Sequence, residues 1–176
     1  MSARLIDMPT LETERLILRG PKLEDYAAWE TFMASPRAQY VGGPVGQHEA
    51  WRAFGHLVGL WALRGHGAFI ITQKGNDQGL GTVGPWLPID WPEPEIGWTC
   101  WEPRLEGTGM MYEASRAALD YVFHTLKWET AVSYIDPENP RSVALAKRLG
   151  AHHDTKAKGP HPDDHVYRHA VPERLI

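Results

Sequence analysis

The segment from Arg104 to Met111 constrains the fold more than any other, because Gly107 and Gly109 separate a strand-like run from a long helical pattern. Glycine permits a sharp turn and lets a ligand approach the backbone closely. The first turn of the helix that follows has unpaired N–H groups and a partial positive charge. The sequence therefore predicts a strand–turn–helix unit that can hold an anion such as a diphosphate.

This turn lacks the features of two common nucleotide-binding loops. A P-loop requires G-x-x-x-x-G-K-[ST], and no such lysine is present here. A dinucleotide-binding fold requires three glycines close to its first strand, whereas this turn follows most of the predicted strands and has no third glycine. Taken alone, the turn is also typical of an ordinary strand-to-helix connection. The surrounding elements must therefore distinguish an anion site from an ordinary connection.

The surrounding pattern predicts one α+β domain over residues 1–176. Alternating and β-branched runs predict seven strands, at 13–19, 67–72, 80–84, 95–101, 130–135, 151–156 and 165–169. Helical spacing of apolar residues predicts four helices, at 23–33, 47–63, 110–127 and 139–149. Three strands in succession precede a strand–helix–strand unit, so we expect a mixed, mostly antiparallel sheet.

Composition excludes several classes of protein. The formal net charge is -4 and Lys and Arg form no long run, which disfavours a general nucleic-acid binder. No stretch reaches the roughly 18 apolar residues of a membrane span, and residues 1–9 lack the apolar core of a signal peptide. Cys100 is the single cysteine, so no internal disulfide can form. The cytoplasm is the simplest compartment for such a chain.

Three segments, in this order, resemble the GNAT superfamily of acyl-CoA N-acyltransferases. Residues 11–19 are similar to the opening of its ribosomal-protein N-terminal acetyltransferase branch (RimJ/RimL-like). Residues 104–109 resemble the R-x-x-G-x-G motif of the superfamily. The third segment consists of residues 136–142 and 147–150, which resemble the D-x-x-N-x-x-S and K-L-G segments of the branch. The resemblance implies a seven-stranded sheet flanked by about four helices, with central strands splayed to admit acyl-CoA. Four residues depart from the usual pattern, namely Glu106, Thr108, Met111 and Ala151.

The resemblance also implies where the co-substrate, acetyl-CoA, is held. Strands 95–101 and 130–135 splay apart, and backbone groups of the first pair with the pantetheine amides. Backbone N–H groups of the glycine turn hold the diphosphate, and Arg104 either adds positive charge or is an ordinary surface arginine. The implied cofactor-binding residues are Trp98, Thr99, Cys100, Trp101, Arg104, Glu106, Gly107, Thr108, Gly109, Met110, Met111, Asn139 and Ser142.

The implied reaction is direct attack of a primary amine on the thioester, which requires a base for the amine and a proton donor for the thiolate. Glu95 is the first candidate base, against the alternative of a solvated carboxylate at a strand end. The other routes for removing the proton of the amine are Glu93 and a chain of water molecules. Asn139 and Ser142 are the candidates at the thiolate, although Asn139 is also a typical helix N-cap. Tyr134 is a weaker candidate acid.

The acceptor is expected between residues 40–45, the second helix and residues 86–91, and is either a protein N-terminus or a small-molecule amine. No metal is expected, because His161 and His165 lie in a predicted hairpin loop. Cys100 is expected to be a buried thiol rather than a nucleophile. Dimers are common in the family, and no nucleic-acid or membrane partner is expected. A catalytically silent acyl-CoA-binding or regulatory module is the alternative function.

Overall fold

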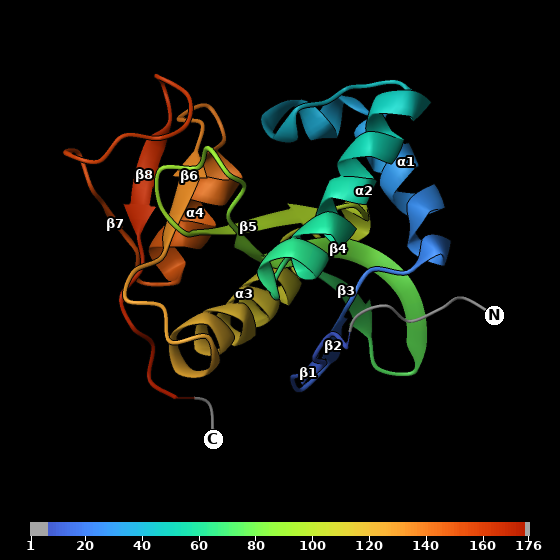
Figure 1. Ribbon diagram of the computed structural model, residues 1–176, viewed down its shortest axis with the longest axis horizontal. Helices are drawn as coiled ribbons and strands as arrows, with labels where there is room; N and C mark the ends of the chain where they lie inside the picture. The colour runs from blue at the N-terminus through green and yellow to red at the C-terminus, as the bar shows by residue number, and fades with distance from the viewer. Residues whose placement is uncertain (1–6, 175–176) are drawn as a thin grey trace.

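An eight-stranded mixed sheet runs through the computed structural model, which describes residues 7–174 (Figure 1). Residues 1–6, which belong to the N-terminal stretch considered for a signal peptide, lie outside this description. The strands follow the spatial order β1 (Leu11–Glu12), β2 (Leu16–Arg19), β3 (Phe69–Gln73), β4 (Asn76–Trp86), β5 (Glu95–Cys100), β6 (Val132–Ile135), β8 (His165–Arg168) and β7 (His152–His153).

The helices also match the predicted positions. They are α1 (Tyr26–Met33), α2 (Gln47–Arg64), α3 (Met110–Asp120) and α4 (Pro140–Arg148). Short 3-10 segments are η1 (Leu23–Asp25), η2 (Pro36–Val41) and η3 (Pro103–Leu105), and a π-helical turn, η4 (Tyr121–Thr125), extends α3. Within residues 7–174, no helix combines the length and the apolar character needed to cross a membrane.

Two hydrophobic clusters bury the two faces of the sheet. Along β3, Phe69 and Ile71 pack with the α3 side, whereas Ile70 belongs to the cluster on the α1 and α2 side. This alternation follows from the two-residue period of a strand. Because helices cover both faces, the central strands are apolar on both sides, and the sheet is a rigid support for the loops at its edge.

The N-terminal strand prediction was wrong in detail. Residues 13–19 do not form one strand, because Thr13 makes a tight turn with Leu16. The Thr13 N–H donates to the Leu16 carbonyl at 3.1 Å, and the Leu16 N–H donates to the Thr13 hydroxyl at 3.0 Å. Leu11 and Glu12 consequently pair antiparallel with β2 as a separate strand. The sheet therefore has eight strands instead of the predicted seven.

The parallel strands β5 and β6 pair at one end only. Their register has a single pair, Glu95 with Val132, whereas β4 and β5 share six. Beyond that pair the Ser133 hydroxyl donates to the Ile96 carbonyl at 2.6 Å, so a side chain takes the place of a backbone rung. The strands then diverge toward Cys100. Figure 1 shows β5 passing between the half that contains β1–β4 and the half that contains β6–β8 and α4.

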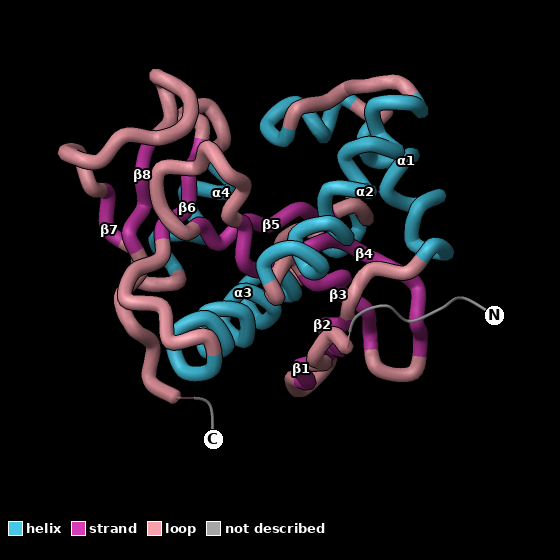
Figure 2. The backbone as a smooth tube through the Cα atoms, viewed as in Figure 1, coloured by secondary structure: helices cyan, strands magenta, loops and turns pink. Residues whose placement is uncertain are grey.

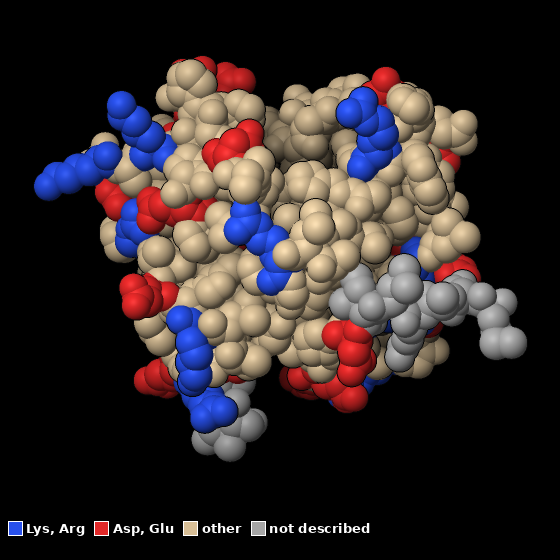
Figure 3. All heavy atoms as spheres, in the orientation of Figure 1, with Lys and Arg blue, Asp and Glu red and all other residues tan. Residues whose placement is uncertain are grey.

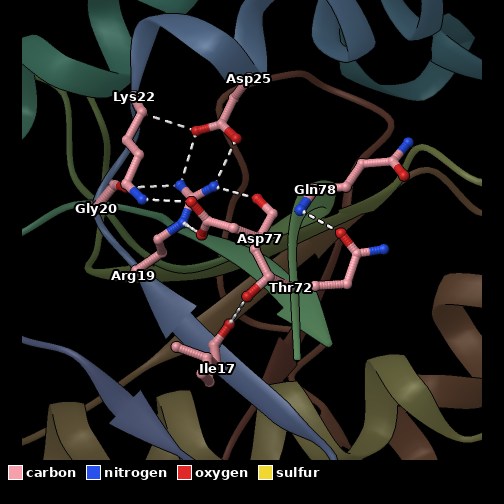
Figure 4. Close-up of polar contacts among 9 residues, drawn as sticks. Ile17, Arg19, Gly20, Lys22, Asp25, Thr72, Asp77 and Gln78 are labelled. Atoms are coloured by element: carbon pink, nitrogen blue, oxygen red, sulfur yellow. Dashed lines mark hydrogen bonds and ion pairs between the residues drawn. The ribbon is translucent and has the colours of Figure 1, made fainter. Parts of the chain in front are cut away.

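A buried ion-pair cluster fixes the N-terminal strand to the β3–β4 hairpin (Figure 4). The Arg19 guanidinium donates to both oxygens of Asp25, at 2.8 Å each, and its Nε donates to Asp77 at 2.5 Å. Asp25 also accepts from the Lys22 N–H at 2.8 Å. Arg19 and Asp25 are only 8% and 3% exposed, so each charge depends on its partner for solvation.

Candidate active site

A cavity of about 810 Å³ opens where β5 diverges from β6, and this is within the usual range for a ligand site. Its walls come from η2, β5, the glycine turn before α3, and α4. Of the residues expected to hold the co-substrate, those that line it are Trp98, Thr99, Cys100, Glu106, Gly107, Gly109, Met111, Asn139 and Ser142. The fold thus brings together three segments that are far apart in the sequence.

The other expected residues lie outside this wall. Trp101 and Met110 are buried in the hydrophobic clusters. The Thr108 hydroxyl donates to the Leu105 carbonyl at 2.6 Å and supports the turn from within. The Arg104 side chain is 70% exposed and pairs with Glu102 at 3.4 Å. Arg104 therefore has the position of an ordinary surface arginine, which was the other interpretation of it.

The glycine turn has the backbone conformation that its sequence requires. Gly107 and Gly109 have φ angles of +75° and +83°, in the left-handed region that favours glycine. The Glu106 and Thr108 N–H groups donate to carbonyls within the turn. Over residues 7–174, no partner is seen for the N–H groups of Gly107, Gly109 and Met110. These three amides, at the N-terminus of α3, are available to an anion.

Two arginines that the sequence prediction missed pair with Glu106 of the turn. Arg37 of η2 donates to Glu106 at 2.6 Å, and to the carbonyls of Cys100 and Trp101 at 2.8 and 2.7 Å. Arg141 of α4 pairs with the other Glu106 oxygen. The carboxylate that departs from the family pattern is therefore neutralised, and the three side chains sum to a charge of about +1 (two cations and one anion). The one sequence signal for these arginines was that Arg141 lies close to Asn139, which was already a candidate site residue.

Charge is otherwise dispersed over the surface in view. Figure 3 shows basic and acidic side chains interspersed among uncharged residues, without a continuous basic patch on that face. The cavity is lined by three arginines, Arg37, Arg141 and Arg148, and by one carboxylate, Glu106, so its charge suits an anionic group.

Glu95 is buried rather than solvated, with 9% of its surface exposed. Its Oε2 accepts from the Trp91 indole N–H at 2.5 Å. Burial raises the pKa of Glu95 to about 7, and the hydrogen bonds from Trp91 and from the Tyr134 N–H offset part of that effect. A Cβ on Gly97 would lie 3.7 Å from the Glu95 Oε1, so this oxygen lies beside residue 97.

The alternative groups near Glu95 are held in other ways. Both oxygens of Glu93 accept from Arg168, at 2.8 and 2.9 Å. Burial raises the pKa of the Tyr134 hydroxyl to about 12, so the phenol keeps its proton. Among residues 7–174 that hydroxyl has no hydrogen-bond partner. Tyr134 also packs against Trp91, with ring centroids 6.3 Å apart. Trp91 of the β4–β5 loop and Tyr134 of β6 thus contact Glu95. Figure 2 shows this loop beside β6.

At the start of α4, Asn139 is the N-cap that the sequence predicted, because its Oδ1 accepts from the Ser142 N–H at 3.2 Å. The Ser142 hydroxyl accepts from the Trp98 indole N–H at 3.1 Å. Burial raises the pKa of the Cys100 thiol, and this thiol donates to the Glu102 carbonyl at 3.3 Å. At neutral pH the thiol is therefore protonated, which does not favour a nucleophilic role.

Of the three segments expected near the acceptor, only residues 40–45 contribute to the lining of the cavity. Tyr40 and Val41 line it, and the Tyr40 hydroxyl donates to the Glu138 carbonyl at 2.8 Å, which joins η2 to the loop before α4. In the 86–91 loop, Trp91 covers Glu95, while Trp86 packs against His56 of α2. In the described part of the chain, no three side chains of the metal-ligating types converge.

Comparisons with known proteins show the family and the fold. The family model described as an acetyltransferase (GNAT) domain matches residues 15–152. The solved structure of an acetyltransferase from Agrobacterium tumefaciens strain C58 is 39% identical, with a TM-score of 0.88, covering 97% of this chain and 99% of that one.

Two curated relatives come from Bacillus. A protein named uncharacterized N-acetyltransferase p20, from Bacillus licheniformis, is 29% identical over 146 residues, which is 81% of this chain and 82% of that protein. The protein YkkB from Bacillus subtilis strain 168 is 32% identical over 101 residues, or 56% of this chain. The match spans 54%, or about half, of the length of YkkB.

Proposed function

The chain belongs to the GNAT family of acyl-CoA-dependent acetyltransferases, and we propose that it transfers the acetyl group of acetyl-CoA to a primary α-amine by direct attack on the thioester. The observation that carries the choice of reaction is the position of Glu95. Its carboxylate is buried at the end of β5 that pairs with β6, and one oxygen lies beside Gly97. A base is therefore available on the strand that lines the co-substrate cavity.

In this proposal acetyl-CoA lies along β5 and extends to the glycine turn. Backbone groups of Trp98, Thr99 and Cys100 pair with the pantetheine. The N–H groups of Gly107, Gly109 and Met110 hold the diphosphate, because they have no other partner among residues 7–174. The guanidiniums that supply positive charge are Arg37 and Arg141, in the role first considered for Arg104.

The acid–base properties of Glu95 favour an α-amine as the acceptor. Transfer of a proton to a carboxylate of pKa about 7 costs about 1 kcal/mol from an α-ammonium, whose pKa is about 7.7–8.0. The same transfer from a lysine ammonium, of pKa about 10.4, costs about 5 kcal/mol. The RimJ/RimL-like character of residues 11–19 supports the same acceptor class, namely a protein N-terminus or a small molecule with an α-amine.

The chemistry then follows from named groups. Glu95 takes the proton of the attacking amine, directly or through one water molecule, and Trp91 keeps the carboxylate in place. Ser142 lines the cavity at the start of α4 and hydrogen-bonds the departing thiolate. Asn139 orders the first turn of α4, which carries Ser142. Tyr134 remains an additional proton donor on the Glu95 side.

Two measurements test this function. Calorimetry with acetyl-CoA is expected to show binding, and CoA release is then followed with matched peptides. A peptide with a free N-terminus is expected to release CoA, whereas an Nα-acetylated peptide that contains lysine is not. Failure to bind any acyl-CoA would refute the proposal. If acetyl-CoA binds but no amine in a broad panel causes CoA release, the result would indicate the silent acyl-CoA-binding module instead.

A further inference from the structure

The Trp98 side chain connects the splayed strand β5 to the helix α4. Its indole N–H donates to the Ser142 hydroxyl at 3.1 Å, in the region where the backbone of β5 no longer pairs with β6. Both residues line the cavity, whereas Glu95 is not among its lining residues and points to the other face of β5 from Trp98. The contact therefore lies beside the path proposed for the thioester.

This hydrogen bond fixes the direction of the Ser142 hydroxyl. An indole N–H is a donor only, whereas a serine hydroxyl has one hydrogen and two lone pairs. The indole must therefore occupy a lone pair of Ser142. Within residues 7–174 the Ser142 hydroxyl has no acceptor for its own hydrogen. That hydrogen remains available to a group in the cavity.

Trp98 is itself held by an uncharged histidine behind it. Its ring lies edge-on to His169, with centroids 6.3 Å apart at 82°. Ser133 donates its single hydroxyl proton to Ile96, so His169 must donate its Nε2–H to Ser133, at 2.9 Å. Burial lowers the pKa of His169 to about 4, which keeps the ring neutral. The indole thus has a fixed support on the side away from the cavity.

We propose that Trp98 is a positioning residue for departure of the thiol, because its indole N–H orients the Ser142 hydroxyl as a hydrogen-bond donor to the sulfur of CoA. This inference rests on the proposed function. As the amine nitrogen bonds to the acyl carbon, the C–S bond breaks and its electron pair stays on sulfur. The amine proton passes to Glu95 and then to water. The thiolate, while held by Ser142, takes a proton from solvent, which completes free CoA.

The experiment compares the binding of CoA and desulfo-CoA from pH 6.5 to 9.5. Desulfo-CoA lacks only the sulfur, so the ratio of the two affinities cancels every titrating group that both ligands contact. A thiol of pKa about 8.5 becomes a thiolate over this range. A hydrogen bond to a charged group is worth about 1.5–3 kcal/mol, so the ratio should rise at least about tenfold with pH in the wild type.

Trp98→Phe keeps an aromatic ring but removes the indole N–H, and Ser142→Ala removes the donor. Both are expected to reduce the rise to below about threefold, with desulfo-CoA affinity changed by less than about twofold. Ser142→Thr, which keeps a hydroxyl, should restore the rise. The matched control is Trp61→Phe, which also loses an indole hydrogen bond, to the Ala68 carbonyl, but lies in the core. This control should keep the full rise.

Other outcomes would contradict the proposal. A full rise in Trp98→Phe, together with its loss in Ser142→Ala, would overturn the role of Trp98. Absence of any rise in the wild type, while both ligands bind, would overturn the role of the pair. Absence of all CoA and acetyl-CoA binding would instead refute the proposed function. If Trp98→Phe folds poorly by circular dichroism, benzothienylalanine at position 98 replaces it, because this isostere has sulfur in place of the N–H.

Discussion

The Glu106 carboxylate and the Arg37 guanidinium meet at 2.6 Å beside the cavity and join η2 to the turn before α3. Glu106 adds a negative charge where the diphosphate is proposed to bind. Replacing it with Gln should therefore tighten acetyl-CoA binding about fivefold, since removing one repulsion at a partly solvated site is worth about 1 kcal/mol. Calorimetry at low salt measures this change, and the gain should shrink as salt is added.

Arg141 gives the reverse prediction at the same site. Arg141→Gln removes a cation from the cluster and should weaken acetyl-CoA binding about fivefold. Arg104→Gln is the matched control, because Arg104 is 70% exposed and pairs with Glu102 outside the cavity wall. Equal losses in the two variants would mean that the pair of arginines has no special relation to the phosphates.

For Glu95, the expected effect is on the rate and on its pH dependence. Glu95→Gln should lower kcat by about 10²- to 10⁴-fold, the usual contribution of a general base. In the wild type, kcat/KM should increase with pH through about 7, because Glu95 accepts a proton only when ionised. An unchanged rate in the variant, with an acceptor that the wild type uses, would remove Glu95 from the mechanism.

The same residue makes stability depend on pH. The pKa of Glu95 is raised from 4.5 to about 7 in the folded state, so between these values the native state binds more protons than the unfolded state. The free energy of unfolding should therefore fall by about 3 kcal/mol as the pH rises from about 4.5 to 7. Urea denaturation at several pH values measures it, and Glu95→Gln should show a smaller fall.

The buried pair of Arg19 and Asp25 should be critical for folding. Asp25→Ala leaves the Arg19 charge buried without its bidentate partner and should cost about 3–5 kcal/mol in the free energy of unfolding. Lys22→Ala is the comparison, because it removes only the exposed ion pair with Asp77 and should cost at most about 1 kcal/mol. Similar costs for the two variants, in chemical denaturation, would contradict this assignment.

The sequence was most informative where structure is local. The order of the elements, the Asn139 cap and the glycine turn all follow from residues a few positions apart, and the structure has them at those positions. The hairpin at Thr13 was missed, because a side-chain hydrogen bond closes it inside an apparently continuous strand.

Long-range contacts were beyond such reasoning. Arg37 lies 69 positions before Glu106, and nothing in either local pattern indicates that they meet. The burial of Glu95 depends on Trp91 and on a neighbouring strand, so its altered acidity needs the folded chain. Arg104, which is adjacent to the turn in sequence, points away from the cavity because η3 directs it outward to Glu102.

The three amides at the glycine turn have an evolutionary consequence. A main-chain N–H is the same chemical group in every residue except proline, so substitutions at Met110 leave the anion-binding donors in place. The acceptor, by contrast, is expected beside residues 40–45, the second helix and residues 86–91, where side chains would contact it. Descendants of this chain can therefore change the amine they accept while the site for the acyl donor is inherited intact.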